Sequence, residues 1–277
     1  MSGASIEMFV DILKIVNWKF LILLKKKNDK MESKTQLEDR IFKYYTNIQF
    51  DRNHLDIYVV RKAIFNFIQQ SASLFNGKVL DLGCGIMPYR DFIKENSNCT
   101  SYVGVDFESS LNDEYSLRKP DFFWDGKKIP LQNNSVDVIL CTELLEHCQN
   151  PEEIINEAFR VLQPGGKLLI TVPFLWNLHL VPYDEYRYTP FSLNRFISNA
   201  GFKSIELRAL GAWDASLAQM LGIWYQQRPL RARYLYYPII KIMISYLLKK
   251  DSFYDKKEIY KEGLMLTGIC GIAYKSV

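Results

Sequence analysis

The sequence predicts an α/β protein with a doubly wound, mainly parallel sheet. Three observations support this fold class. Short apolar runs of strand length recur along the chain, segments of helical periodicity separate them, and a glycine-rich turn directly follows the first run. Short buried strands that alternate with helices are typical of βαβ units, in which helices cover both faces of a parallel sheet.

The expected strands are short and rich in Val, Leu and Ile, and two of them end in a carboxylate. Helices of apolar periodicity separate the later strands, and Gly201 closes one of these helices. The expected strands are Lys78–Asp81, Ser101–Val105, Val136–Cys141, Lys167–Val172, Phe202–Ala209 and Thr267–Tyr274, and the clearest helices are Pro151–Leu162 and Ser192–Ala200.

This pattern divides the chain into four parts. Helical periodicity in Ile6–Leu24 and Tyr58–Gln69 predicts an N-terminal helical cap, residues 1–70. The core follows as residues 71–210, and a final strand, residues 264–277, completes its sheet. Residues 211–263 lie between them, are rich in aromatic side chains and predict a helical insertion that forms a lid or an acceptor wall.

The composition, with 48% hydrophobic and 24% charged residues, is that of a folded globular protein. A net charge of +4 is too small to indicate nucleic acid, so no nucleic-acid partner is expected. The five cysteines include no Cys-x-x-Cys pair, which indicates reduced thiols and a cytoplasmic protein.

Two apolar segments permit either packing on the core or peripheral contact with the cytoplasmic face of a membrane. Ile6–Leu24 carries charges such as Asp11, Lys14 and Lys19, which are too many for a membrane-spanning helix. Tyr234–Lys250 combines aromatic and aliphatic side chains with flanking cations, a composition that suits a membrane surface.

The turn Gly83-Cys84-Gly85 after the first strand is the first candidate binding site. Glycine lets the backbone approach a ligand closely, and Asp106, which ends the next strand, can accept both hydroxyls of a ribose. Together these residues indicate an adenosine-containing cofactor. Pro88 stands where a dinucleotide-binding turn has its third glycine, and it has no N–H for a pyrophosphate. It therefore favours S-adenosylmethionine over NAD.

Four segments, in order and at suitable spacing, resemble the motifs of class I (Rossmann-like) S-adenosylmethionine-dependent methyltransferases of the type 11 kind. The resemblance covers about residues 77–209 and implies seven strands in the order 3-2-1-4-5-7-6 with an antiparallel last strand. Met87 departs from the pattern, since many members have a third glycine there. The segments are Val79–Gly85, Tyr102–Phe107, Asp125–Leu131 and Ser135–Glu143, and the match continues through Glu146-His147 and Arg160–Gly166.

The resemblance implies a cofactor-binding role for each matching residue. Asp81 and the backbone of Gly83, Cys84 and Gly85 would hold the methionine end of S-adenosylmethionine. Asp106 would hold the ribose, with Phe107, Asp125 and Gly126 around the adenine, and Cys141 and Thr142 would line the cleft near the sulfonium. From the residues alone, an ordinary loop acid is the alternative interpretation of Asp125, and a thiol packed in the core is the alternative for Cys141.

A second resemblance concerns Glu143, Glu146 and His147, whose spacing would place three metal ligands on one face of a helix. This Glu-x-x-Glu-His pattern is similar to the magnesium site of ubiquinone-pathway O-methyltransferases and of small-RNA 3′-end methyltransferases. The resemblance implies Mg²⁺ as an additional cofactor, with His179 as a fourth ligand. Many relatives without a metal have similar residues that order the start of the helix, and this alternative stays open.

The segment after the Lys167–Val172 strand contains the candidate catalytic residues. It resembles a branch of the family in which this stretch faces the transferred methyl group, often in the tailoring of glycans or natural products. His179 is the first candidate general base, because its ordinary pKa is near neutrality, and Asp184 is the second. Arg187 would bind an anionic group of the acceptor, or would pair with Asp184 and order the loop.

We therefore predict O-methylation of a small-molecule or glycan-like acceptor, which includes the case of a lipid-linked one. Methylation of carbon or nitrogen in a lipid or quinone precursor is the alternative within the enzymes. A non-catalytic scaffold that binds S-adenosylmethionine is the alternative from another class.

Overall fold

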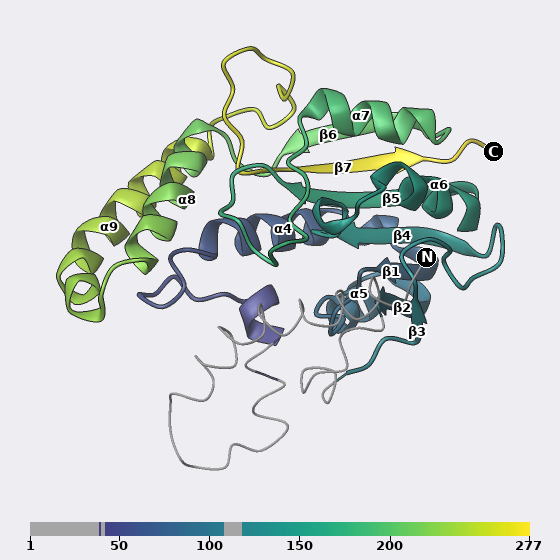
Figure 1. Ribbon diagram of the computed structural model, residues 1–277, viewed down its shortest axis with the longest axis horizontal. Coiled ribbons are helices and arrows are strands. Elements are labelled where there is room, and N and C mark those ends of the chain that lie inside the picture. Colours follow the sequence, from purple (N-terminus) through teal and green to yellow (C-terminus); the bar gives the residue numbers. More distant parts are fainter. Residues whose placement is uncertain (1–38, 40–41, 108–117) are drawn as a thin grey trace.

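The computed structural model describes residue 39, residues 42–107 and residues 118–277, and these residues form a twisted sheet with helices packed on it (Figure 1). The predicted helical run Ile6–Leu24 lies outside the described residues. Within the described part of the chain, no helix combines the length and the apolar character needed to cross a membrane.

The sheet has seven strands in the order β3-β2-β1-β4-β5-β7-β6, which confirms the predicted fold class and strand order. β7 runs antiparallel to both β5 and β6, while the remaining neighbours are parallel. The strands are β1 (Asn76–Leu82), β2 (Asn98–Phe107), β3 (Phe122–Trp124), β4 (Val136–Thr142), β5 (Leu162–Pro173), β6 (Lys203–Ala209) and β7 (Gly268–Tyr274).

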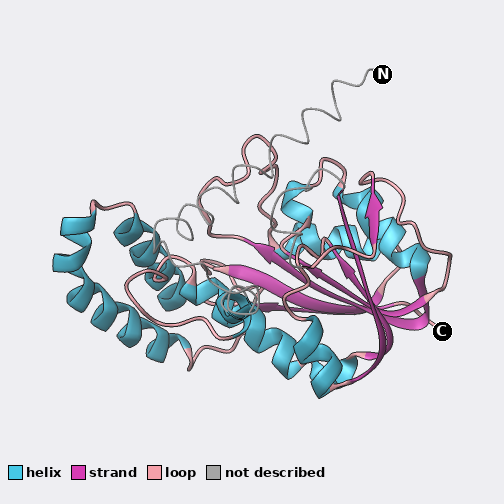
Figure 2. Ribbon diagram, turned by 90° about the horizontal axis from the view of Figure 1, so that it is seen from below, coloured by secondary structure: helices cyan, strands magenta, loops and turns pink. Residues whose placement is uncertain are grey.

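The central strands are apolar on both faces because each face carries helices. Successive residues of a strand point to opposite faces, so Val138 and Leu140 of β4 pack in one core while Ile139 and Cys141 pack in the other. The first core lies under α4 (Tyr58–Gln70) and α5 (Arg90–Asn96). The second lies under α6 (Pro151–Val161) and α7 (Pro190–Asn199), and Figure 2 shows helices on the two sides of the sheet.

The insertion before β7 is a helical hairpin, α8 (Trp213–Gln226) and α9 (Leu230–Asp251), which extends beyond one end of the sheet (Figure 1). Buried residues of both helices form a third core with Leu55 and Val59, at the start of α4. The buried Asp251 carboxylate, at the end of α9, accepts hydrogen bonds from the backbone N–H groups of Ala212 and Ala215, 3.0 and 3.1 Å long, and pairs with Lys256. This contact joins the end of α9 to the start of α8.

Two local details differ from the sequence-based expectation. The helix after the glycine turn begins only at Arg90, because Met87 and Pro88 extend the turn. Residues 143–147 do not form an α-helix, since Glu143 has a positive φ of 50° and only Leu145–His147 form a short 3-10 turn. Three ligands on one α-helical face are therefore not present, and the metal-binding geometry predicted from that face is wrong.

Candidate functional site

The glycine turn brings backbone N–H groups to the carboxyl ends of β1 and β2. Gly83 and Gly85 have φ values of 72° and 49°, a region that L side chains rarely occupy. The N–H of Gly83 donates to the Val105 carbonyl of β2 at 2.9 Å, so the turn is tied to the neighbouring strand. A Cβ on Gly83 would lie 2.7 Å from Leu144, whereas a Cβ on Gly85 would meet no atom within 4 Å. The turn therefore leaves open space beside Gly85.

Asp106 lies opposite this turn, at the end of β2. Its Oδ2 accepts a hydrogen bond of 2.6 Å from the Gly85 N–H, and its Oδ1 accepts one of 2.7 Å from the Phe107 N–H. These bonds hold the carboxylate at the carboxyl edge of the sheet. A carboxylate in this position beside a glycine turn suits the hydroxyls of a ribose.

Asp81 lies on β1 just before the turn and is buried. Its Oδ2 accepts a hydrogen bond of 2.6 Å from the Tyr102 hydroxyl. Burial raises the pKa of Asp81 to about 7, and the nearby Asp106 charge adds to this, while the bond from Tyr102 opposes it. A buried acid with a raised pKa is prepared to pair with a cationic group, such as the ammonium or sulfonium of S-adenosylmethionine.

Met87 occupies a position where members of the family that this sequence resembles often have glycine. Its backbone keeps the glycine-like conformation, with a φ of 53°. Its side chain is fully buried. A Cβ on Gly104 would lie 2.6 Å from the Met87 sulfur, so the thioether packs directly on the β2 backbone. Packing of this side chain offsets the backbone strain, and the departure from the family pattern leaves the turn intact.

Asp125 and Gly126 follow β3 at the edge of the sheet. The Asp125 Oδ1 accepts hydrogen bonds from the N–H groups of Lys127 and Lys128, which lower the pKa of this carboxyl. Gly126 has a φ of 77°, and a Cβ there would lie 2.7 Å from the Phe107 ring. Asp125 thus orders its own loop while it lines a surface hollow with residues 123, 124 and 128–131.

Cys141 and Thr142 end β4 beside the turn. Cys141 is buried in the core under α6, and burial raises the pKa of its thiol well above the ordinary value. It is therefore a neutral thiol that packs in the core, which is the alternative to a position in the cleft near the sulfonium. Thr142 is half-buried at the carboxyl end of the strand.

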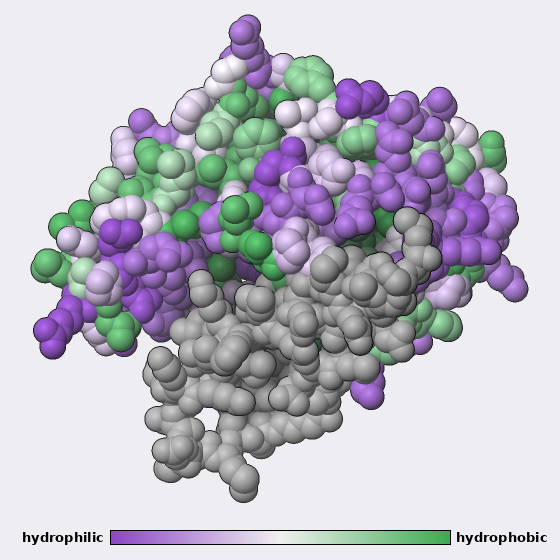
Figure 3. Space-filling view, viewed as in Figure 1, coloured by the Kyte–Doolittle hydropathy of each residue, from purple (hydrophilic) through white to green (hydrophobic). Residues whose placement is uncertain are grey.

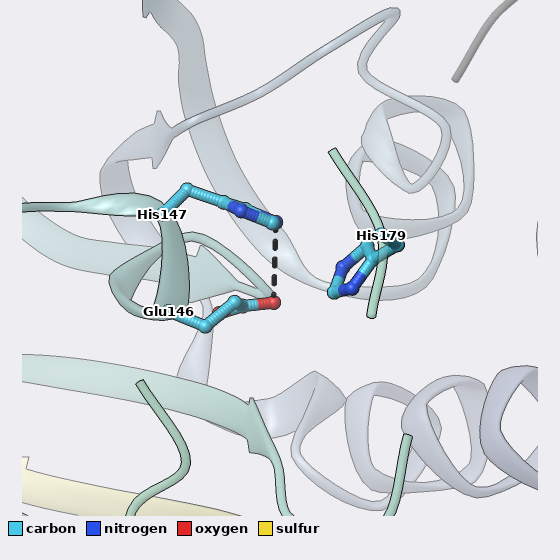
Figure 4. A group of neighbouring side chains, drawn as sticks. All are labelled: Glu146, His147 and His179. Carbon is cyan, nitrogen blue, oxygen red and sulfur yellow. Dashed lines mark ion pairs between the residues drawn. The ribbon is translucent and has the colours of Figure 1, made fainter. Parts of the chain in front are cut away.

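Glu146, His147 and His179 form a compact group of potential ligand atoms (Figure 4). One oxygen or nitrogen atom from each residue lies within 4.8 Å of the other two. Glu146 and His147 come from the turn after β4, whereas His179 comes from the segment after β5. The ring centroids of the two histidines are 4.8 Å apart.

Hydrogen bonds indicate which nitrogen of each histidine carries the proton. His147 Nδ1 lies 3.0 Å from the Tyr183 carbonyl, which can only accept, so Nδ1 carries the proton and Nε2 keeps a lone pair. His179 Nδ1 lies 3.1 Å from the Asp184 Oδ2, which favours the same tautomer. Burial lowers the pKa of His147 to about 4 and that of His179 below its ordinary value, so both rings are neutral at pH 7.

Glu146 is fully buried, and neither carboxylate oxygen has a hydrogen-bond partner. Its Oε1 lies 3.6 Å from the His147 Nε2. Burial raises the pKa of Glu146 well above the ordinary value, and the nearby Glu143 adds to the shift. A buried carboxyl without partners is energetically unfavourable unless a proton or a ligand completes its contacts.

Glu143, the first residue of the predicted metal set, does not join this group. Its Oε1 accepts a hydrogen bond of 2.8 Å from the Thr171 hydroxyl of β5. Burial raises the pKa of Glu143, against the effect of this bond and of the Arg61 and Arg187 charges. His179 takes its place beside Glu146 and His147.

Asp184 and Arg187 form an internal ion pair, which is the alternative to binding of an acceptor anion by Arg187. The guanidinium donates two hydrogen bonds to the Asp184 carboxylate, 2.5 and 2.7 Å long, and also donates to the Tyr186 and Trp176 carbonyls. Burial acts to raise the pKa of Asp184, but the bonds from Arg187 and the proximity of His179 outweigh it and lower the pKa. This pair orders the segment that carries His179.

Several residues of the site have no signal in the sequence. The contacts of Tyr102 with Asp81, of Thr171 with Glu143 and of the Tyr183 carbonyl with His147 join segments that are distant along the chain. Tyr102 alone had a partial signal, since a hydroxyl on a buried strand next to β1 needs a partner. The other two partners become identifiable only when the strands are placed side by side.

Comparison with known proteins indicates the family of the sheet domain. Residues 80–170 match a family model described as a methyltransferase domain. The chain is 24% identical to a ubiquinone biosynthesis O-methyltransferase of Cupriavidus pinatubonensis, over 52% of this chain and 67% of the relative. It is 29% identical to a malonyl-[acyl-carrier protein] O-methyltransferase of Alcanivorax borkumensis, over 53% of this chain and 52% of the relative. The chain thus spans about half to two thirds of these relatives.

The fold is also similar to that of a solved structure. Phosphoethanolamine N-methyltransferase 2 of Haemonchus contortus, in complex with S-adenosyl-L-methionine, has a TM-score of 0.50 to this chain at 14% identity. The alignment covers 91% of this chain and 62% of the Haemonchus chain. This similarity concerns the fold.

Proposed function

Because the chain carries a class I S-adenosylmethionine-dependent methyltransferase domain, we propose that it methylates a hydroxyl of a small-molecule or glycan-like acceptor. The two O-methyltransferase relatives favour oxygen as the acceptor atom. The observation that carries the proposal is His179, whose Nδ1 lies 3.1 Å from the Asp184 carboxylate and which lies in one group with Glu146 and His147.

The cofactor would lie beside the glycine turn and Asp106, at the carboxyl edge of the sheet. When bound, S-adenosylmethionine supplies a methyl group on a sulfonium that is already a strong electrophile. Asp106 would bind the ribose hydroxyls, Asp81 would face the cationic end, and the open space beside Gly85 would admit the ligand close to the backbone. Asp125, Phe107 and Gly126 would surround the adenine at the edge of the sheet.

His179 would remove the proton from the acceptor hydroxyl. A neutral imidazole with a lone pair on Nε2 can accept a proton, and the Asp184 carboxylate stabilises the imidazolium that results. Arg187 would act as a positioning residue, because it holds Asp184 in place rather than contacting the acceptor. The acceptor oxygen must then lie in line with the sulfur–methyl bond.

The test is transfer of labelled methyl from S-adenosylmethionine into fractionated cell extract, with the parent chain and with His179→Ala. Loss of transfer with unchanged cofactor binding supports a reaction that needs a base, as O-methylation does. Retained transfer in His179→Ala would favour methylation of carbon or nitrogen in a lipid or quinone precursor. Tight cofactor binding without transfer to any fraction would instead favour the scaffold.

The same group of side chains also fits a divalent metal ion. Two imidazole nitrogens and one carboxylate are a ligand set that suits first-row transition metals better than Mg²⁺, which prefers oxygen ligands. The Tyr183 carbonyl and Asp184 would be the outer partners that orient His147 and His179, as is usual for metal-bound histidines. The Glu146 carboxylate, which is buried without a hydrogen-bond partner, is the specific observation that favours a metal. A metal there would lower the pKa of an acceptor hydroxyl.

Metal binding and the base role exclude each other, because both need the lone pair on His179 Nε2. Metal analysis of the purified chain, before and after chelation, separates them. A stoichiometric transition metal that is lost in Glu146→Gln would assign the group as a metal site. Full methyl transfer by chelated, metal-free protein would assign His179 as the base.

A further inference from the structure

The outer surface of α8 is apolar where a surface helix is normally polar. Trp213, Leu217, Met220 and Trp224 are all exposed. Their spacing of four, three and four residues places them in one row along the helix. The opposite side of α8 is buried against the start of α4, through residues such as Ala215, Ala218 and Tyr225. The apolar row therefore does not belong to the core of the hairpin.

α9 repeats this arrangement. Leu235, Ile239, Ile242 and Tyr246 are exposed at the same spacing, while Ile240 and Ile244 point into the core. Ile239 and Ile242 are 62% and 69% exposed, although aliphatic side chains of this size are normally buried. Near the tip of the hairpin the exposed aromatic side chains of the two helices are neighbours, since the rings of Trp224 and of Tyr236, which follows Leu235, have centroids 5.6 Å apart. We call these two rows together the hairpin face.

Most of the charge along the hairpin is positive, and the acidic residues Asp214 and Glu262 lie only near Trp213, at the start of α8. Residues 215–250 contain no aspartate and no glutamate. The basic residues gather toward the two ends of α9, and three of them, Arg231, Lys249 and Lys250, are exposed. Figure 3 shows hydrophobic and hydrophilic side chains side by side along the side of the molecule formed by the hairpin. The full set of basic residues in this range is Arg228, Arg231, Arg233, Lys241, Lys249 and Lys250.

We propose that the hairpin face binds the surface of an anionic membrane. Aliphatic side chains would enter the boundary between headgroups and acyl chains, and tryptophan and tyrosine suit this interface because their rings have an apolar body and a polar edge. The cations would lie at the level of the lipid phosphates, where each contributes to attraction. A second copy of this chain fits less well, because the exposed Arg231, Lys249 and Lys250 would repel the basic residues of the other copy.

Cosedimentation of the full chain with lipid vesicles tests this proposal. The chain is expected to bind vesicles of phosphatidylcholine with phosphatidylglycerol, and to bind vesicles of phosphatidylcholine alone more weakly. Raising the salt concentration should weaken binding to the anionic vesicles, because salt screens the contribution of the cations. A chain that stays in the supernatant with anionic vesicles at low salt overturns the proposal.

The double variant Ile239→Ser/Ile242→Ser removes two apolar side chains from the centre of the hairpin face. It should weaken vesicle binding by about tenfold or more. Both positions are exposed, so circular dichroism and calorimetric binding of S-adenosylmethionine should match the parent. The matched control is Phe191→Ser on α7, which is 63% exposed and lies outside the hairpin. This control should bind vesicles like the parent.

Two further results would contradict the proposal. If the double variant binds anionic vesicles as tightly as the parent, another segment, such as residues 6–24, carries the binding. If sedimentation velocity shows a dimer that the double variant abolishes, the hairpin face joins two copies of the chain. The charge variant Arg231→Gln/Lys249→Gln/Lys250→Gln provides an independent measure, since it should reduce binding and its salt dependence without removing apolar area.

Discussion

The proposed cofactor side and the proposed acceptor side of this site are built in different ways. On the cofactor side, the glycine turn follows β1 and Asp106 lies at the end of the adjacent β2, and a hydrogen bond from a backbone N–H to the carboxylate joins them. On the acceptor side, Glu146, His147 and His179 come from two separate segments, and side chains form most of the contacts. The first depends on local backbone geometry, whereas the second depends on how distant segments pack.

The electrostatics of the two sides differ as well. Asp81 is a buried acid whose pKa is raised to about 7, and its ionised form would be completed by a cationic ligand. Asp184 on the acceptor side already has Arg187 and His179 as partners, and its pKa is lowered. A cationic ligand would therefore stabilise the ionised Asp81 on the cofactor side, whereas the imidazole rings of His147 and His179 on the acceptor side are neutral.

The largest effect is expected for His179→Ala, which removes the proposed base. Methyl transfer should fall by between about a hundredfold and ten-thousandfold, the range for a general base. Calorimetric binding of S-adenosylmethionine should not change, because His179 belongs to the acceptor side. A variant that loses cofactor binding as well would show that the two sides are not separable.

Asp106→Ala should instead weaken the binding of S-adenosylmethionine. Hydrogen bonds to a charged group contribute about 1.5–3 kcal/mol each, so cofactor affinity should fall by roughly tenfold to a hundredfold. Asp125→Ala is the matched control, since this exposed acid already uses Oδ1 in its own turn, and its loss should weaken binding less. Equal losses in the two variants, measured by calorimetry, would remove the special role of Asp106.

The pKa of Asp81 predicts a pH dependence of cofactor binding. The raised value means that the ligand-free chain favours the protonated acid below about pH 7, whereas a cationic ligand favours the carboxylate. Affinity should therefore rise with pH, by up to about tenfold per pH unit below pH 7, and binding should release a proton. Calorimetry in buffers of different ionisation enthalpy, at several pH values, measures the affinity and the number of protons released.

Asp81→Asn is expected to abolish this dependence, and Tyr102→Phe should shift it to higher pH, because the Tyr102 bond lowers the pKa of Asp81. The same raised pKa acts on the ligand-free fold. Protonated Asp81 stabilises the folded chain below the unfolded-state pKa of this carboxyl group, and this contribution is lost as the pH rises through about 7. An affinity independent of pH between about pH 6 and pH 8 would contradict the proposed ion pair.

The smallest effects separate the two glycines of the turn. Each alanine substitution adds roughly 1 kcal/mol of strain at a positive φ. Gly83→Ala should lower the free energy of unfolding by more than this, because its Cβ would contact Leu144, whereas Gly85→Ala should mainly weaken cofactor binding. Urea unfolding and calorimetry measure the two quantities. Identical behaviour of both variants would show that the space beside Gly85 is not used by the ligand.

The class of fold and the residues of the proposed cofactor side could both be predicted from the sequence. Strand periodicity, the turn Gly83–Gly85 and the carboxylate of Asp106 are local features, so they could be recognised before any strand was placed. The sheet order came from resemblance and is confirmed. The short strand β3 was not among the runs predicted from periodicity, because its three residues are too few to show a pattern.

Only the tertiary structure decided which side chains come together on the proposed acceptor side. Spacing along the chain grouped Glu143 with Glu146 and His147 as if on a helix, but a positive φ at Glu143 turns its side chain toward Thr171 of the neighbouring strand. His179 replaces it, because the loop after β5 folds back over the end of β4. Local patterns depend on neighbours in the chain, whereas contacts between distant side chains exist only after the segments that carry them have packed.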